Sequence, residues 1–144
     1  MNMLGHMVDY GIIGLLIVLS IVAIAVAIER YRFYKNTDVE SYQTSQELES
    51  ALTGRLHIVA TIGSNAPYIG LLGTVLGIMQ TFYSMGTGGT TNVNDIMAGL
   101  ALALKATAAG LLVAIPSIVL YNLLHRKVNV LMLAKEAQNE RQKF

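Results

Sequence analysis

The sequence predicts an all-α integral membrane protein with three transmembrane helices, its N-terminus outside the membrane and its C-terminus in the cytoplasm. The composition is 53% hydrophobic and only 13% charged, which is far from the usage of soluble proteins. Three apolar runs reach the length that a bilayer requires. Lys and Arg residues gather on one side of these runs, which sets the orientation. We therefore expect a single membrane domain over residues 1–144.

The three spans are predicted at residues 10–28, 66–83 and 96–124. The first run ends at Glu29 and Arg30, which we interpret as charges at the cytoplasmic interface that stop the helix from sliding. The third run is longer than a bilayer needs, so its helix should project into water.

The polar segments between and after the spans carry most of the basic residues. Residues 29–65 contain three arginines and one lysine, and residues 125–144 contain five further Lys and Arg residues. The N-terminal tail and the loop at residues 84–95 contain none. Because cytoplasmic segments are enriched in Lys and Arg, we place residues 29–65 and 125–144 in the cytoplasm. The tail and the loop should face the periplasm of a bacterial inner membrane.

The two cytoplasmic segments are expected to be helical. Leu48, Leu52, Leu56 and Val59 recur at helical spacing, which predicts one amphipathic helix over residues 38–62. A solvated linker is the alternative, although a linker does not need such a stripe. The C-terminal tail shows a similar apolar side and is predicted to be helical as well.

Small and weakly polar side chains form one stripe along the second span and another along the third. Large apolar side chains occupy the other faces of both helices. The stripe of the second span consists of Gly63, Pro67, Gly70, Thr74, Gly77, Thr81 and Ser84. The stripe of the third span consists of Gly99, Ala103, Thr107, Gly110, Ala114, Ser117 and Tyr121.

The two stripes allow two interpretations. Small residues in lipid mark a close approach of helices, and Gly73 with Gly77 forms a GxxxG pair. Alternatively, both stripes line a lumen in an oligomer, where Thr74 and Thr107 offer hydroxyl groups to water or to a partner's carboxyl group. The simpler fate of each hydroxyl is a bond to a carbonyl group of its own helix. The residues predicted to line a proton pathway are Thr74, Thr107, Gly70, Gly77, Thr81, Gly110 and Ala114.

Ionisable groups are scarce within the spans. None of the nine Asp and Glu residues lies inside one, whereas proton conduction through hydrocarbon needs a group that gains and loses the proton. If the chain works in proton transfer, another protein must supply that carboxyl group. Lys105 is the one charged residue within the spans, and it lies off the threonine stripe. We expect it to snorkel to headgroups or to pair with a neighbour such as Asp9, and a direct role in transport is the alternative.

Other classes of function lack support. A net charge of +1 without a dense basic run argues against a nucleic-acid partner. Without cysteine the chain has no disulfide, thiol nucleophile or thiolate metal site, and its three histidines are far apart in the sequence. No catalytic or phosphate-binding motif is found. We expect no enzyme activity, no cofactor and no metal.

Two segments carry motifs that resemble those of a known family. APYIGLLGTVLGIMQTF at residues 66–82 and ALKATAAGLLVAIPSIVLYN at residues 103–122 are similar to the second- and third-helix signatures of the ExbB/TolQ/MotA family of proton-channel motor proteins. Residues 28–30 resemble the end of the family's first helix. The resemblance implies a homopentameric ring around a lumen that holds the transmembrane helices of an ExbD-like protein. An aspartate of that single-span partner would be the missing titratable group, and proton flow would energise a TonB-like transducer.

The resemblance also implies roles for particular positions. Thr74 and Thr107 correspond to the family's pore threonines, Pro67 and Pro116 to its helix-breaking prolines, and Glu29 to its first-helix glutamate. Pro116 also predicts a kink by itself, because it removes a helix hydrogen bond.

The sequence departs from the family in three respects. Leu102 occupies a position where a glutamate is common, Lys105 replaces an apolar residue, and the segment between the first two spans is short. Motifs do not separate TonB-dependent import across the outer membrane from a TolQ-like role in envelope integrity. A MotA-like stator is disfavoured because that group has a fourth span and a larger cytoplasmic domain. A non-conducting membrane scaffold is the alternative from a different class.

Overall fold

The computed structural model describes residues 2–88 and 92–143, and all of the regular structure in them is helical. The elements are α1 (Asn2–Lys35), the 3-10 helix η1 (Val39–Ser41), α2 (Ser45–Thr53), α3 (Leu56–Gly86) and α4 (Val93–Lys143). Three stretches are long and apolar enough to cross a bilayer, namely Gly5–Lys35, Leu56–Gly86 and Val93–Gln142. The predicted all-α class and the three candidate spans are therefore confirmed.

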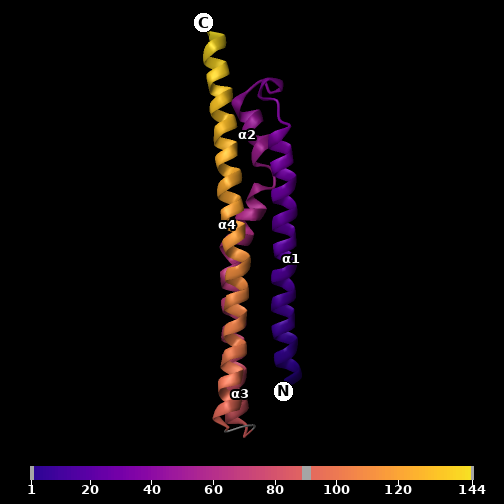
Figure 1. Cartoon of the computed structure of the whole chain (residues 1–144), viewed down its shortest axis with the longest axis vertical. Coiled ribbons are helices and arrows are strands. Elements are labelled where there is room, and N and C mark those ends of the chain that lie inside the picture. Colours follow the sequence, from indigo (N-terminus) through magenta and orange to yellow (C-terminus); the bar gives the residue numbers. More distant parts are fainter. Residues whose placement is uncertain (1, 89–91, 144) are drawn as a thin grey trace.

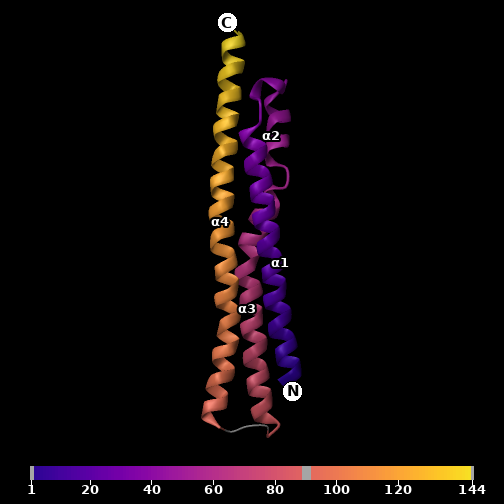
Figure 2. The ribbon, with the colours of Figure 1, turned by 45° about the vertical axis from the view of Figure 1, so that its right-hand side comes forward.

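The three long helices form an elongated bundle in which each helix packs on the other two (Figure 1). α1 and α4 run in the same direction, and α3 runs back between them, as Figure 2 shows most clearly. We call the end that holds the N-terminus and the α3–α4 connection the loop end, and the opposite end the α2 end. α4 continues past α2 to the C-terminus.

Each predicted span lies inside a longer helix. α4 contains 51 residues, which at 1.5 Å per residue is about 75 Å, compared with roughly 30 Å for the hydrocarbon core of a bilayer. The predicted extension of the third span and the predicted helical tail are confirmed as one helix up to Lys143. In the predicted loop at residues 84–95, α3 ends at Gly86 and α4 begins at Val93, while residues 89–91 lie outside the described residues.

The single amphipathic helix predicted over residues 38–62 is wrong, because the chain folds there as η1, α2 and the start of α3. The break falls at Gly54 and Arg55, and Arg55 has a left-handed backbone with a φ of 63°. The predicted apolar stripe is nevertheless buried, and its members are Leu48, Leu52, Leu56 and Val59. The alternative of a solvated linker is therefore wrong as well.

Side chains of α1 explain why α2 ends where it does. In a continuous helix, the carbonyl groups of Ala51 and Leu52 would accept hydrogen bonds from amides one turn later. Instead, Arg30 Nη1 donates to Ala51 O at 2.9 Å, and Tyr34 Oη donates to Leu52 O at 2.5 Å. These bonds satisfy the carbonyl groups at the end of α2 and fix it against α1.

The start of α2 is determined locally. Thr44 precedes the helix in an extended conformation, and its Oγ1 accepts a hydrogen bond from Glu47 N at 3.1 Å. Asp38 caps η1 in the same way by accepting a hydrogen bond from Glu40 N at 3.0 Å. Such caps satisfy amide groups that have no partner within the helix.

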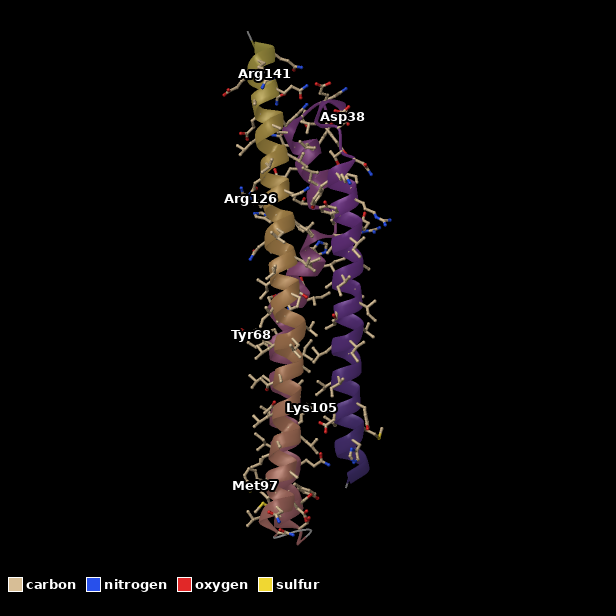
Figure 3. All side chains as sticks on the ribbon, in the orientation of Figure 1. Asp38, Tyr68, Met97, Lys105, Arg126 and Arg141 are labelled. Atoms are coloured by element: carbon tan, nitrogen blue, oxygen red, sulfur yellow. The ribbon has the colours of Figure 1, made fainter. Side chains whose placement is uncertain are left out.

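The bundle has two apolar cores. The core at the α2 end consists of Ala27, Tyr34, Leu48, Leu52, Leu56, Leu124 and Val128. A smaller core farther along the bundle consists of Leu16, Ala66 and Ala114. Charged and polar side chains are concentrated around Asp38, Arg126 and Arg141 at the α2 end, whereas apolar side chains predominate around Tyr68 (Figure 3). Outward-facing apolar side chains, such as Leu112 at 74% exposure, suit contact with lipid or with neighbouring chains.

Candidate functional site

The small-residue stripes of α3 and α4 pack directly against each other. A methyl group built on Gly70 would lie 2.6 Å from Ala106 O and 3.0 Å from Gly110 Cα. A methyl group built on Gly77 would lie 2.7 Å from Ala103 Cβ. Since non-bonded carbon atoms pack best at about 3.5–4.0 Å, glycine is what permits this close approach. The close-packing interpretation therefore describes these residues within one chain.

Ala114 and Thr81 extend this contact in both directions. Ala114 is buried beside Leu16 of α1 and Ala66 of α3. Thr81 Oγ1 would lie 2.8 Å from a methyl group built on Gly99. The residues predicted to line a proton pathway thus lie along the α3–α4 contact, and a lumen-lining role in an assembly stays a prediction.

Thr74 and Thr107 meet within this contact. Their hydroxyl groups are hydrogen-bonded to each other, and Thr74 Oγ1 lies 2.8 Å from Ala103 O. Because a hydroxyl has a single proton, Thr74 donates to Ala103 O and accepts from Thr107. The carbonyl of its own helix, at Gly70, is farther away at 3.4 Å. Bonds between the helices therefore hold Thr74, which is buried, whereas Thr107 is half-buried.

The two prolines lie within continuous helices. Pro67 belongs to α3 and Pro116 to α4. Each removes a backbone hydrogen bond, yet neither ends its helix. Both helices thus continue past their prolines, and the kinks at Pro67 and Pro116 stay predictions.

A polar cavity of about 630 Å³ lies at the loop end between α1, α3 and α4. It brings together three titratable side chains, those of His6, Asp9 and Asp95. Ala103 also lines the cavity, and its carbonyl group accepts the hydrogen bond of Thr74. The cavity therefore reaches the residue that contacts the threonine pair.

The sequence pattern placed every Asp and Glu outside the predicted spans and gave no direct sign of this cavity. Two signals could have revealed it. His6 and Asp9 are three residues apart and therefore share one face of α1. Asp95 directly precedes the third span, which the predicted topology brings to the same end of the bundle. Within residues 2–88 and 92–143, no group of His, Asp and Glu side chains is arranged to hold a metal ion.

Leu102 and Lys105 lie on α4 near the cavity but differ in position. Leu102 lines the cavity and is 52% exposed. Lys105 is exposed in the loop-end half of α4 (Figure 3). No ion pair joins Lys105 to Asp9 in the part of the chain that the structure describes. The predicted pairing is therefore not found, and snorkelling stays a prediction.

Glu29 and Arg30 do more than mark the end of a span. Arg30 donates to the Glu29 carboxylate at 2.5 and 2.7 Å, and its guanidinium lies 4.6 Å from the centre of the Phe33 ring. The residue is only 8% exposed, because it is enclosed where α1 meets α2. The interpretation as interfacial charges is therefore incomplete for Arg30, which joins the two helices.

Comparison with known proteins places these features in a family. The profile of the MotA/TolQ/ExbB proton channel family matches residues 22–137. The biopolymer transport protein ExbB of Aquifex aeolicus is 56% identical over 137 residues, which cover 95% of this chain and 93% of that protein. The putative biopolymer transport protein ExbB-like 2 of Helicobacter pylori is 60% identical over 127 residues, covering 88% and 85%. ExbB of Salmonella typhimurium is 47% identical over 70 residues, which are only 29% of that longer protein.

The family match runs from within α1 to the C-terminal part of α4. It includes both motif segments, the threonine pair and the α3–α4 contact. Relatives of similar length exist, so the short segment between the first two spans is shared with part of the family. The chain is a multi-pass membrane protein that belongs to the MotA/TolQ/ExbB proton channel family.

Proposed function

We propose that this chain is a subunit of a proton-driven motor that energises TonB-dependent import across the outer membrane. The family and the names of the relatives support a proton-channel role in biopolymer transport. In the proposal, the chain forms a homopentameric ring in a bacterial inner membrane, with the N-terminus in the periplasm. The ring encloses the transmembrane helices of an ExbD-like single-span protein and passes work to a TonB-like transducer.

The observation that carries this proposal is that one residue, Ala103, belongs both to the wall of the loop-end cavity and to the contacts of the threonine pair. The cavity is lined by the side chains of His6, Asp9 and Asp95. Ala103 belongs to the cavity lining and also accepts the hydrogen bond of Thr74. The threonine pair is therefore hydrogen-bonded to a residue in the wall of the cavity, which would allow a proton path to pass between them.

The chemistry of the pair requires a partner. Hydroxyl groups do not lose their protons at neutral pH, and no Asp or Glu lies in the three predicted spans. An aspartate of the single-span partner would supply the titratable group at this level. When protonated, it would donate to Thr107, and when charged, it would compete for the proton that Thr107 gives to Thr74. The two protonation states would thus bind the pair differently, which couples proton transfer to movement of the partner.

A non-conducting scaffold is the second candidate. It is favoured by the observation that the small-residue faces of α3 and α4 already satisfy each other within one chain. A TolQ-like role in envelope integrity would use the same proton path with a different transducer.

Proton flux separates the motor from the scaffold. The chain and an ExbD-like partner are reconstituted together in liposomes, and proton influx is followed with a pH-sensitive dye. Thr74→Val and Thr107→Val keep the shape of the side chain and remove the hydroxyl. We expect flux to fall by about tenfold or more, as loss of one interaction of about 1.4 kcal/mol implies. Thr61→Val, at an exposed position of α3, serves as the matched control and should conduct like the wild type.

Native mass spectrometry of the same preparations shows whether the complex is still assembled. Loss of flux in an intact complex supports the motor. Wild-type flux in both threonine variants would sink the proposed path. Absence of flux from the wild-type complex with its partner would favour the scaffold.

A further inference from the structure

A second cavity lies between α1 and α4 at the α2 end, apart from the site described above. Its volume is about 820 Å³, within the range of about 300–1,000 Å³ that is typical of ligand pockets. We call it the α1–α4 groove. Its apolar walls are formed mainly by Ile24, Ala27, Ile28, Leu120, Leu123 and Leu124.

Four basic side chains border this groove. Arg32 and Lys35 come from α1, and Arg126 and Lys127 come from α4, whereas no Asp or Glu is among the lining residues. All four are exposed, and none forms an ion pair within residues 2–88 and 92–143. Lys127 Nζ lies instead 4.7 Å from the centre of the Tyr31 ring. The groove thus has positive charge without a carboxylate to balance it.

The apolar and basic parts of the groove are arranged in the same order on both helices. α1 and α4 run in the same direction (Figure 1), and on each helix the apolar residues named above precede the basic ones, while Val130 and Leu131 also line the groove beyond Lys127 on α4. The basic end also belongs to the segments whose Lys and Arg content predicts a cytoplasmic location. Tyr31 lies at the boundary, where tyrosine is enriched in membrane proteins. A membrane lipid has the same order, with acyl chains toward the bilayer centre and a phosphate at the surface.

We propose that the α1–α4 groove binds one anionic phospholipid from the leaflet at the α2 end. An acyl chain lies against Ile24, Ile28 and Leu123, and the phosphate contacts Arg32 and Arg126. A zwitterionic headgroup would bring an ammonium group close to four cations, whereas an anionic headgroup balances them.

Charge also decides between a lipid and a second copy of this chain. A second copy that filled the groove with its own α1 or α4 would have to present carboxylates to the four cations. On these two helices, the one acidic side chain at this level is Glu29, and it is already hydrogen-bonded to Arg30. A lipid phosphate meets the requirement without breaking that pair.

Native mass spectrometry of the delipidated complex, titrated with phosphatidylglycerol or with phosphatidylcholine of the same acyl chains, tests the proposal. The double variant Arg32→Gln/Arg126→Gln removes one cation from each wall and leaves the contact between Lys127 and Tyr31 in place. Each cation near an anionic lipid surface corresponds to about a fivefold change in affinity, so this variant should bind phosphatidylglycerol about 25-fold more weakly.

The control Arg55→Gln/Arg141→Gln removes two exposed arginines outside the groove and changes the net charge equally. We expect it to bind phosphatidylglycerol like the wild type. Equal affinity of the wild type for both lipids, or equal weakening by both double variants, would overturn the proposal. It would also be overturned if the wild type took up neither lipid and Leu123→Cys cross-linked neighbouring copies, because a second copy would then occupy the groove.

Discussion

Replacing Gly70 with alanine should push α3 and α4 apart beside the threonine pair. The added methyl carbon would lie 2.6 Å from Ala106 O and 3.0 Å from Gly110 Cα. Because non-bonded carbon atoms pack best at about 3.5–4.0 Å, the helices must separate by roughly 0.5–1 Å. Overpacking costs about 1–3 kcal/mol, and the better helix propensity of alanine offsets about 1 kcal/mol of this, so a net destabilisation of up to about 2 kcal/mol is expected.

The same displacement acts on the hydrogen bonds of Thr74, one turn farther along α3. Its hydrogen bond to Ala103 O is 2.8 Å long. If the helices separate by roughly 0.5–1 Å, this O···O distance becomes longer than the usual limit of about 3.0 Å for such a bond. Proton flux in liposomes should therefore fall together with the midpoint of thermal unfolding.

Gly11→Ala on α1 is the matched control. A methyl group built there has no atom within 4 Å, so this substitution adds helix propensity without a clash. Its unfolding midpoint, followed by circular dichroism of the purified complex, should equal or exceed that of the wild type. If Gly70→Ala also unfolds at the wild-type temperature and conducts normally, the close contact does not position the threonine pair, and the reasoning fails.

Three further substitutions test other parts of the structure. Arg30→Met should destabilise the α2 end by about 1–3 kcal/mol, because Ala51 O loses its donor and Glu29 loses its partner. Amide hydrogen exchange in α2 should become faster. Exchange at the wild-type rate would contradict this expectation. Arg55→Gly should keep or raise stability, by up to about 1 kcal/mol, because glycine adopts a φ of 63° without a Cβ clash. A clear drop in melting temperature would show that the arginine side chain stabilises the protein by more than the backbone strain costs. Lys105→Gln should leave flux and assembly unchanged, because Lys105 is exposed and has no ion pair among the described residues; reduced flux would assign it a direct role in transport.

The long helices and their main contact could be predicted from the sequence. The length of a membrane-spanning apolar segment is set by the thickness of the bilayer. Hydropathy therefore identified the three helices without knowledge of how they pack. The spacing of Gly70 and Gly110 within small-residue stripes indicated a close helix approach, and the structure brings these residues together. Periodicity did not decide between packing within one chain and exposure to a lumen, because both use the same face.

The break after α2 could not be predicted, because Leu52 and Leu56 keep helical spacing across it. The side chains that end α2, those of Arg30 and Tyr34, lie on another helix. They donate to the two carbonyl groups that backbone amides one turn later would otherwise bind. Tertiary contacts of this kind leave no local signal in the segment that they interrupt. The loop-end cavity was missed for a similar reason, since its titratable side chains come from the starts of two helices far apart in the sequence.

α4 continues without a break from the threonine pair to the α2 end of the bundle. Thr107 and Lys135 belong to the same hydrogen-bonded rod and are about 40 Å apart along its axis. Lys135 is buried and donates to Tyr42 O, so the far part of the rod is fastened to the polypeptide that precedes α2. In the proposed motor, a rotation of α4 near Thr107 would therefore be transmitted to Lys135. Under this proposal, a change of protonation at the threonine pair would be linked through α4 to the polar α2 end of the chain.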